Sequence, residues 1–372
     1  MTRIILLDVD GVLVQPGGYR AALRATVNYF IGPKLDIPEE FLTDLEKRGI
    51  SSEWDMAPLL LAACWNEVLS QQPVQNLPSD VFLAASEISR QCKVDGAAHF
   101  FIPEFPLMEG QYPAESALQA GCFAFIPHEL RRNLLSQTRN IRKSHTMRIF
   151  QHFTLGSEQF TETYNLSAEF EIDSFLLKYD GSHISDEIRA KLCQPNHHLA
   201  AFTSRPSKPP REIRQPTIGY APEAELALEL VGLSRIPLIA FGKLEYLAAQ
   251  YGLDPAALVK PSPVQALAAL LAAWTGEEWP ALQAANHWHE TGLLSAMFDR
   301  LPRAFEWIVV EDTMGGINSV RAAGEILKKA GFDVHIHAIG LTSGNSAKAS
   351  SFGRAGLPYF QDWESLIRGV GL

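Results

Sequence analysis

The feature that most constrains the fold is a set of short apolar runs separated by segments of helical periodicity. The first run covers residues 4–7, and four similar runs follow in the second half of the chain, at 199–202, 237–241, 307–310 and 335–339. A short apolar run is typical of a strand that is buried on both faces of a parallel sheet. The alternation of such strands with helices predicts an α/β fold with a doubly wound, Rossmann-like parallel sheet.

Helical patterns fill the intervals between the later runs. Apolar residues recur at helical spacing over 223–233, 243–251 and 316–330. A further helix is expected to begin at Ser262-Pro263-Val264-Gln265. There Ser262 can cap the helix, Pro263 suits its first position, and Gln265 completes a capping box. Strand and helix therefore alternate regularly through this half of the chain.

The stretch from Gly17 to Asp180 differs, because it consists mainly of helical patterns. These lie at 19–30, 39–47, 56–70, 79–92 and 128–137. Pro16-Gly17-Gly18 and Asp180-Gly181-Ser182 predict flexible joints at its two ends. The sequence therefore predicts an α/β core formed by residues 1–16 and 181–372, interrupted by a helical insert at 17–180. A smaller excursion is expected at 276–303, between two elements of the core.

Charge and hydropathy exclude several classes of protein. The 32 basic and 42 acidic residues give a net charge of −10, which is unsuited to binding nucleic-acid phosphates by bulk electrostatics. The longest apolar run, 266–274, is far shorter than the ~20 residues that span a membrane. Asp8 and Asp10 interrupt the apolar N-terminus too early for a signal peptide. The four cysteines form no CxxC pair, which argues against a disulfide framework or a zinc site. We therefore expect a cytoplasmic protein with neither a nucleic-acid nor a membrane partner.

Chemically active side chains follow the predicted strands, at the point where each strand ends. The segments are Asp8-Val9-Asp10-Gly11-Val12 after 4–7, Thr203-Ser204-Arg205 after 199–202, Lys260 after the short apolar stretch 256–259, and Glu311-Asp312-Thr313 after 307–310. Ligands of parallel α/β sheets bind at the carboxyl ends of the strands. Four strand ends are thus expected to bring four carboxylates, a hydroxyl and an ammonium to one edge of the sheet.

This combination of side chains favours phosphoryl transfer. A carboxylate nucleophile repels a phosphate ester, so the site must supply cations. Lys260 can be one, and a Mg²⁺ ion held by Asp8 and Asp312 can be another. The Thr203 hydroxyl can donate to a phosphoryl oxygen. Asp8 and Asp10 would face the same way in a regular strand, so that one can attack while the other handles the proton of the leaving oxygen.

The four segments resemble, in order, the four motifs of the haloacid-dehalogenase-like (HAD) superfamily. The resemblance rests on Asp8-Val9-Asp10-Gly11-Val12, on Thr203, on Lys260 in Lys260-Pro261-Ser262-Pro263, and on Glu311-Asp312-Thr313-Met314-Gly315-Gly316 followed by Ala322-Ala323-Gly324. The insert lies where this superfamily places a helical cap, although it is unusually long. The resemblance covers the whole predicted core and implies an HAD-like hydrolase with a large helical cap.

The resemblance also implies a role for each residue. Asp8 would be the nucleophile that forms an aspartyl-phosphate, and Asp10 would be the general acid and then the base. Mg²⁺ would be held by the side chains of Asp8 and Asp312 and by the backbone carbonyl of Asp10. Thr203 and Lys260 would bind the phosphoryl group.

The remaining candidates have less specific signals. Glu311 would support the metal or its waters, or lie outside the ligand shell. Ser204 and Arg205 are candidate phosphate-binding residues, although Arg205 could instead cap a helix. The insert contains an acid-free basic run that would meet an anionic substrate or form a solvated helix face: Arg131, Arg132, Arg139, Arg142, Lys143 and Arg148. His287 and His289 lie two residues apart without a partner cluster, which favours a helix surface over a metal site.

The sequence thus favours a Mg²⁺-dependent phosphatase that acts on a small phosphorylated metabolite. The small substrate is expected because a lid over the strand ends would exclude polymers. A sugar-phosphate mutase of the same superfamily is the alternative among enzymes, since it shares the Glu-Asp form of the fourth motif. A non-catalytic metabolite-binding protein is the alternative from another class, and the presence of all candidate catalytic side chains argues against it.

Overall fold

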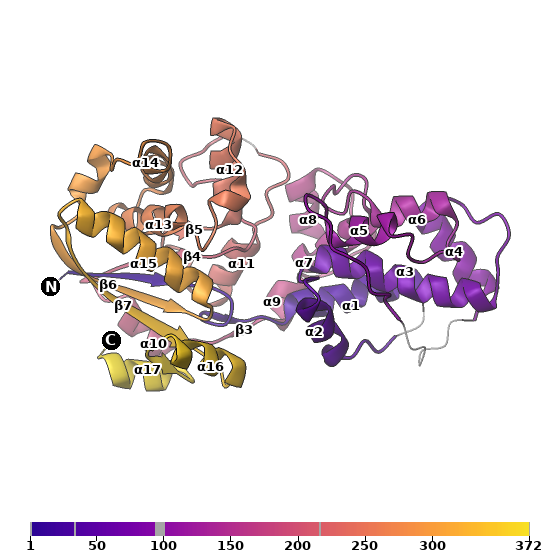
Figure 1. Ribbon diagram of the computed structural model, residues 1–372, viewed down its shortest axis with the longest axis horizontal. Helices are drawn as coiled ribbons and strands as arrows, with labels where there is room; N and C mark the ends of the chain where they lie inside the picture. Colours follow the sequence, from indigo (N-terminus) through magenta and orange to yellow (C-terminus); the bar gives the residue numbers. More distant parts are fainter. Residues whose placement is uncertain (1, 33–34, 94–100, 216, 372) are drawn as a thin grey trace. The chain divides into compact units, whose positions relative to one another are not determined.

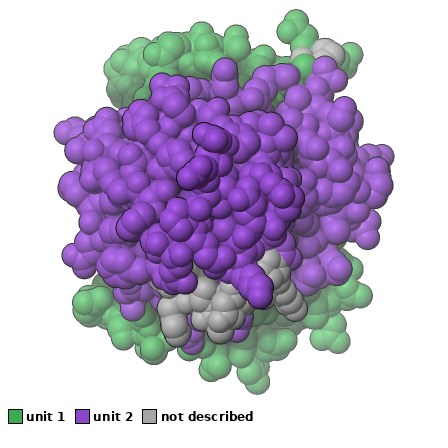
Figure 2. All heavy atoms as spheres, turned by 90° about the vertical axis from the view of Figure 1, so that its right-hand side faces the viewer, with its two compact units in different colours: residues 1–16, 180–372 green, residues 17–179 purple. Residues whose placement is uncertain are grey.

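The computed structural model describes residues 2–32, 35–93, 101–215 and 217–371. The chain forms two compact units, coloured separately in Figure 2. Unit 1 comprises Met1–Pro16 and Asp180–Leu372, and unit 2 comprises Gly17–Tyr179. Asp180, which the sequence pattern placed at the end of the insert, belongs to unit 1.

Unit 1 contains a six-stranded sheet in the order β5-β4-β1-β6-β7-β8, and every neighbouring pair is parallel. The strands are β1 (Thr2–Leu7), β4 (His197–Phe202), β5 (Leu238–Ile239), β6 (Ala304–Glu311), β7 (Asp333–Leu341) and β8 (Tyr359–Phe360). The predicted α/β class and parallel sheet are confirmed. Strand β8 was not predicted, because Tyr359 and Phe360 stand between a proline and a glutamine and are not part of a longer apolar run.

Successive side chains of the central strand β1 divide the core of unit 1 into two layers. Ile4 and Leu6 pack in one apolar cluster, Ile5 and Leu7 pack in another, and all four are fully buried. The first cluster includes residues of α13 (Pro263–Thr275) and α15 (Met314–Lys329). The second includes residues of α10 (Asp186–Leu192), α11 (Glu223–Leu230) and α17 (Trp363–Val370) (Figure 1). Burial on both faces explains why this strand is apolar without interruption.

The helices of unit 1 connect the strands and cover the sheet (Figure 1). They are α10 (Asp186–Leu192), α11 (Glu223–Leu230), α12 (Phe241–Tyr251), α13 (Pro263–Thr275), α14 (Glu278–Thr291), α15 (Met314–Lys329), α16 (Ser346–Arg354) and α17 (Trp363–Val370). The excursion predicted at 276–303 contains α14 and the short 3₁₀ helix Ala296–Arg300. Helix α14 packs against α13, so the excursion is part of the core layer.

The apolar stretch 256–259 was expected to end a strand, and this expectation is wrong. Residues Pro255–Ala257 form a 3₁₀ helix, whose first turn is capped by the Asp254 carboxylate accepting from the Ala256 amide at 2.9 Å. A proline followed by two alanines favours this turn over an extended strand. Lys260 therefore reaches the sheet edge from the loop before α13.

A small second sheet lies where the chain leaves and re-enters unit 1. Strands β2 (Val14–Gln15) and β3 (Gly181–Ser182) are antiparallel, with Val14 opposite Ser182 and Gln15 opposite Gly181. The first predicted joint directly follows β2, whereas Gly181 and Ser182 of the second joint form strand β3 itself. The two crossings are therefore tied to each other by backbone pairing within unit 1.

The described residues of unit 2 form helices and connecting loops, and none of them lies in a strand. Its helices are α1 (Gly18–Ile31), α2 (Glu39–Lys47), α3 (Glu53–Gln71), α4 (Val81–Gln91), α5 (Pro113–Gln119), α6 (His128–Leu135), α7 (His145–Leu155), α8 (Ser157–Tyr164) and α9 (Phe175–Tyr179). Helix α7 was not predicted, although it packs on α1 and α3. Its buried face contains Gln151, His152 and Thr154, which weaken the apolar periodicity. Among the described helices, none has the length and apolarity required to cross a membrane.

Candidate active site

Asp8 lies at the carboxyl end of the central strand. Its amide donates to the Val310 carbonyl at 3.0 Å, which continues the pairing of β1 with β6 by one residue. The carboxylate is buried, and the residue is only 5% exposed. The parallel pairing thus delivers Asp8 and the residues after Val310 to the same place.

Lys260 joins Asp8 to Glu311. Its ammonium group donates to Asp8 Oδ1 at 2.8 Å and to Glu311 Oε1 at 2.6 Å, and it lies 4.4 Å from the centre of the Phe202 ring. The Lys260 side chain is only 9% exposed. Three residues that are far apart in the sequence thus form one buried ionic cluster.

Glu311 organises the turn that follows β6. Its second oxygen, Oε2, accepts from the amides of Asp312 and Thr313, each at 3.0 Å, and from the Thr313 hydroxyl at 3.1 Å. A Cβ atom at Gly316 would collide with the Glu311 carboxylate, so a glycine is needed there. Because both oxygens already accept hydrogen bonds, Glu311 is suited to holding Lys260 and the turn in place.

Asp312 lies next to this pair and contacts a lysine that sequence reasoning missed. The Lys348 ammonium donates to Asp312 Oδ2. On the other side, Gly11 approaches Asp312 so closely that a Cβ at Gly11 would strike the carboxylate, and Gly11 has a φ of +74°. Both features require glycine at position 11. No motif marks Lys348, because it follows β7, where the sequence shows one lysine among small and polar residues.

The cluster contains more negative than positive charge. The pKa of the Asp8 carboxyl is raised to about 7, mainly by burial and also by Glu311 and Asp10, against the opposing effect of Lys260. Burial and the nearby Asp8 raise the pKa of Asp312 to about 6, although Lys348 and Lys260 oppose this. Burial would lower the pKa of Lys260, but Asp8 and Glu311 outweigh it and hold the pKa above its usual value. Burial and the neighbouring carboxylates thus disfavour the ionised forms of Asp8 and Asp312 more than the two lysines favour them.

The cluster fits a hard divalent cation. Asp8, Glu311 and Asp312 each offer a carboxylate oxygen, and these oxygens lie within 4.8 Å of one another. Oxygen donors of this kind are the ligands that Mg²⁺ prefers. Because the carboxylates repel one another, a divalent cation would stabilise them. The residues present are thus compatible with the predicted Mg²⁺ site.

Thr203 is joined by a buried glutamine to the loop that carries Lys260. The Gln265 amide donates to the carbonyls of Thr203 at 2.9 Å and Ile239 at 3.0 Å, and its oxygen accepts from the Lys260 amide at 3.0 Å. Gln265 therefore ties the loop after β4 and the end of β5 to the loop that carries Lys260. The expected capping box is not formed, because the fully buried Gln265 side chain has turned to these loops.

Asp10 and Arg205 form a second ionic group at this edge. The Arg205 guanidinium donates to both oxygens of Asp10, with its shortest contact at 2.6 Å, and to Asp180 Oδ2 at 2.9 Å. The side chains of Arg205 and Asp180 are buried, and Asp10 is partly exposed. Arg205 thus contacts two carboxylates of unit 1, and Ser204 beside it is exposed. Asp180 is a contact that no sequence motif indicates.

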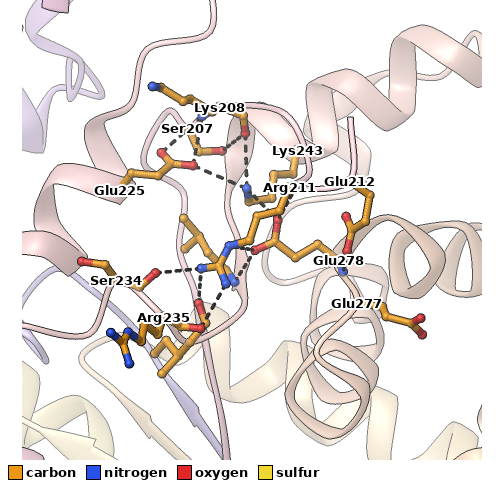
Figure 3. Close-up of polar contacts among 12 residues, drawn as sticks. Ser207, Lys208, Arg211, Glu212, Glu225, Ser234, Arg235, Lys243, Glu277 and Glu278 are labelled. Atoms are coloured by element: carbon orange, nitrogen blue, oxygen red, sulfur yellow. Dashed lines mark hydrogen bonds and ion pairs between the residues drawn. The ribbon is translucent and has the colours of Figure 1, made fainter. Parts of the chain in front are cut away.

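A second polar network anchors the loop that begins at Thr203 (Figure 3). The buried Glu278 carboxylate accepts from the amide and side chain of Arg211 at 3.0 and 3.1 Å, and from the Leu238 amide at 2.9 Å. Lys243 contacts Glu278 at 3.0 Å and Glu225 at 3.4 Å. Glu278 belongs to the predicted excursion, which therefore serves to fasten this loop to the core.

The basic run of the insert is largely engaged within unit 2. Arg139 pairs with the buried Asp55, Arg132 with Glu129, and Arg148 with Glu169. Arg131 donates to Cys122 and Arg142 donates to Tyr164, in each case to the backbone carbonyl. These contacts favour a structural role for the arginines. Lys143, His287 and His289 are exposed.

No family model matches the sequence, and no curated protein is significantly similar to it.

Proposed function

We propose that the protein is a Mg²⁺-dependent phosphohydrolase that acts on a small phosphorylated metabolite. The observation that carries this proposal is the ammonium of Lys260, which contacts both Asp8 and Glu311 at the carboxyl ends of β1 and β6. The parallel sheet and the order of the four segments also support an HAD-like core. On this proposal, unit 2 is the helical cap, and a cap is the reason for expecting a small substrate.

The proposed metal ligands are the side chains of Asp8 and Asp312 and the backbone carbonyl of Asp10. When bound there, Mg²⁺ would offset the charge of the phosphoryl group and orient it against Asp8. Lys260 would remain on Asp8 and Glu311 and would attract the same phosphoryl group. The Thr203 hydroxyl oxygen accepts from the Arg205 amide at 3.3 Å, so its hydrogen can be donated to a phosphoryl oxygen.

In the first step, a carboxylate oxygen of Asp8 attacks phosphorus, and the bond from phosphorus to the leaving oxygen breaks. Asp10 donates a proton to that oxygen, so an alcohol departs and Asp8 becomes an aspartyl-phosphate. The contact between Lys260 and Asp8 reduces the repulsion between the nucleophile and the ester. Glu311 holds Lys260 for this purpose from the opposite side.

In the second step, Asp10 takes a proton from water, and the resulting oxygen attacks phosphorus. The bond between phosphorus and Asp8 breaks, which releases inorganic phosphate and restores the carboxylate. Three contacts from Arg205 hold the Asp10 side chain in place for this role. For Asp10 to act as the acid, its contacts with Arg205 have to loosen.

The proposal is tested by release of inorganic phosphate from a panel of small phosphoesters, with and without Mg²⁺. We expect Mg²⁺-stimulated hydrolysis, and Asp8→Asn should lower it on the order of 10³-fold or more, because the nucleophile is lost. Asp299→Asn is the matched control, since Asp299 is exposed and pairs only with the exposed Arg303 among described residues.

Absence of Mg²⁺-stimulated hydrolysis across the panel would contradict the proposed activity. Retention of phosphate on an isomerised sugar would instead identify a mutase. Tight binding of a phosphorylated metabolite without turnover would identify a binding protein.

A further inference from the structure

Lys348 is a cation of the candidate site that none of the four sequence segments contains. It lies on α16, which follows the last residues of β7, two strands away from β1 in the sheet. Its ammonium contacts Asp312 Oδ2, and the Lys348 side chain is 31% exposed. Asp312 is also a proposed ligand of Mg²⁺. The Asp312 carboxylate is therefore the partner of Lys348 and also a proposed ligand of Mg²⁺.

The position of Lys348 in its helix is unfavourable without a partner. The Asn345 side chain caps α16 by accepting from the amides of Ala347 and Lys348, so Lys348 lies in the first turn. The amino end of a helix carries partial positive charge and favours anions. No acidic residue lies in this turn to offset the cation. The contact with Asp312 supplies the missing counter-charge.

The charge balance of the cluster also indicates that Lys348 is a replaceable counter-ion. Three carboxylates, from Asp8, Glu311 and Asp312, meet two ammonium groups, from Lys260 and Lys348. Lys260 lies between two of these carboxylates and is buried. Lys348 contacts the third carboxylate, that of Asp312, and its side chain is 31% exposed against 9% for Lys260, so it is the cation that can move away. A divalent cation in its place, together with Lys260, would balance the three carboxylates.

We propose that Lys348 is a built-in counter-ion of the metal site, which competes with a divalent cation for the Asp312 carboxylate and is displaced when the cation binds. This inference rests on the proposed metal site, but it does not require any particular substrate. It assigns a function to a lysine outside the four motifs. As a consequence, Lys348 lowers the observed affinity of the site for Mg²⁺.

The test is an isothermal titration calorimetry experiment in which Mg²⁺ is added to the metal-stripped full chain. Lys348→Met should lower the Kd for Mg²⁺ about tenfold, which corresponds to ~1.4 kcal/mol, because the competitor is gone. Lys348→Arg keeps the positive charge and should bind Mg²⁺ as the wild type does. Lys348→Gln is a second neutral variant should Lys348→Met fold poorly.

Lys328→Met is the matched control. Lys328 also lies in a helix of unit 1 and pairs with an exposed carboxylate, that of Glu325. Its loss changes the net charge by the same amount without touching the site. We expect its Kd for Mg²⁺ to equal that of the wild type. Thermal unfolding in EDTA is a second readout, in which Lys348→Met should melt below the wild type because Asp312 loses its partner.

The proposal is overturned if Lys348→Met and Lys348→Gln bind Mg²⁺ no more tightly than the wild type, or if Lys328→Met tightens binding equally. It is also overturned if the wild type does not bind Mg²⁺. Phosphoester hydrolysis is measured on the same samples. If Lys348→Met binds Mg²⁺ more tightly but no sample hydrolyses phosphoesters, the counter-ion proposal is supported and the phosphatase proposal is contradicted. If Mg²⁺ stimulates hydrolysis but Lys348→Met binds Mg²⁺ as the wild type does, the phosphatase proposal is supported and the counter-ion proposal is contradicted.

Discussion

Unit 1 contains two buried lysines, Lys260 and Lys243, and their surroundings differ in charge balance. Each lysine contacts a fully buried glutamate, Glu311 or Glu278. Around Lys243, the carboxylates of Glu225 and Glu278 meet two cations, Lys243 and Arg211.

Around Lys260, the carboxylates outnumber the cations, and the pKa values of Asp8 and Asp312 rise to about 7 and about 6. A balanced network can only hold elements together, and an excess of carboxylate can also receive a cation. The same kind of ion pair is thus structural at one position and a candidate catalytic device at the other.

The largest effect on stability is expected from the balanced network. Lys243→Met would leave Glu278 buried without its ammonium partner, and loss of one partner of a buried pair costs about 3–5 kcal/mol of the free energy of unfolding. Urea denaturation measures this, with the exposed Lys208→Met as the control. Addition of Mg²⁺ should not restore the lost stability. A loss as small as that of Lys208→Met would mean that Lys243 is not needed to hold the loop.

A change in the cluster around Lys260 should affect the rate of phosphoester hydrolysis. Lys260→Met removes the cation that draws the phosphoryl group to Asp8, and we expect hydrolysis to fall about 10²–10³-fold, as for loss of one transition-state donor. Steady-state kinetics with the best substrate of the panel measures this. Lys191→Met, an exposed change on α10, should leave the rate unchanged. Hydrolysis at the wild-type rate in Lys260→Met would remove Lys260 from the mechanism.

Metal binding should separate the two regions further. At a Mg²⁺ concentration 100 times its Kd, the free energy of unfolding should rise by about 2.7 kcal/mol, because only the folded protein offers the site. Asp312→Asn, which lacks one proposed ligand, should lose most of this gain. Glu225→Gln, a change in the other network, should keep it. Chemical denaturation with Mg²⁺ and with EDTA measures the difference, and an equal gain in both variants would exclude Asp312 as a ligand.

The smallest expected effect concerns the pH dependence of the balanced network. Burial raises the pKa of Glu225 above its value in the unfolded chain, although Lys243 opposes the rise. The folded protein therefore binds more protons between the two values, so stability is greatest below the unfolded pKa and is lost as the pH rises through the folded pKa.

Glu225→Gln does not titrate there. It should lose less stability than the wild type between about pH 4 and about pH 7, by less than ~1 kcal/mol because Glu225 is partly exposed. Urea denaturation at the two pH values measures this. An equal loss in both proteins would show that Glu225 does not titrate differently in the folded state.

The hydropathy pattern was sufficient to predict elements whose burial follows from their own residues. Residues 4–7 are apolar because both faces of β1 are buried, so the strand is legible in the sequence. The same reasoning failed at 256–259, where apolar residues form a 3₁₀ helix, and at α7, where polar residues are buried. At 255–257 a proline and two alanines favour a tight turn, whereas at α7 tertiary contacts bury polar residues that a hydropathy pattern assigns to the surface.

The residues at the strand ends could be named from the sequence, because a parallel sheet necessarily collects the carboxyl ends of its strands at one edge. Their partners could not. The contacts of Gln265 with Thr203 and Ile239, of Asp180 with Arg205, and of Lys348 with Asp312 join residues that are 25 or more positions apart. The bond between Gln265 and Lys260 is the one local contact among them. A sequence pattern does not show which of these distant residues come into contact, because the contacts form only when the backbone folds. The order of strands and polar segments thus determined the kind of site, and tertiary packing decided which charges balance within it.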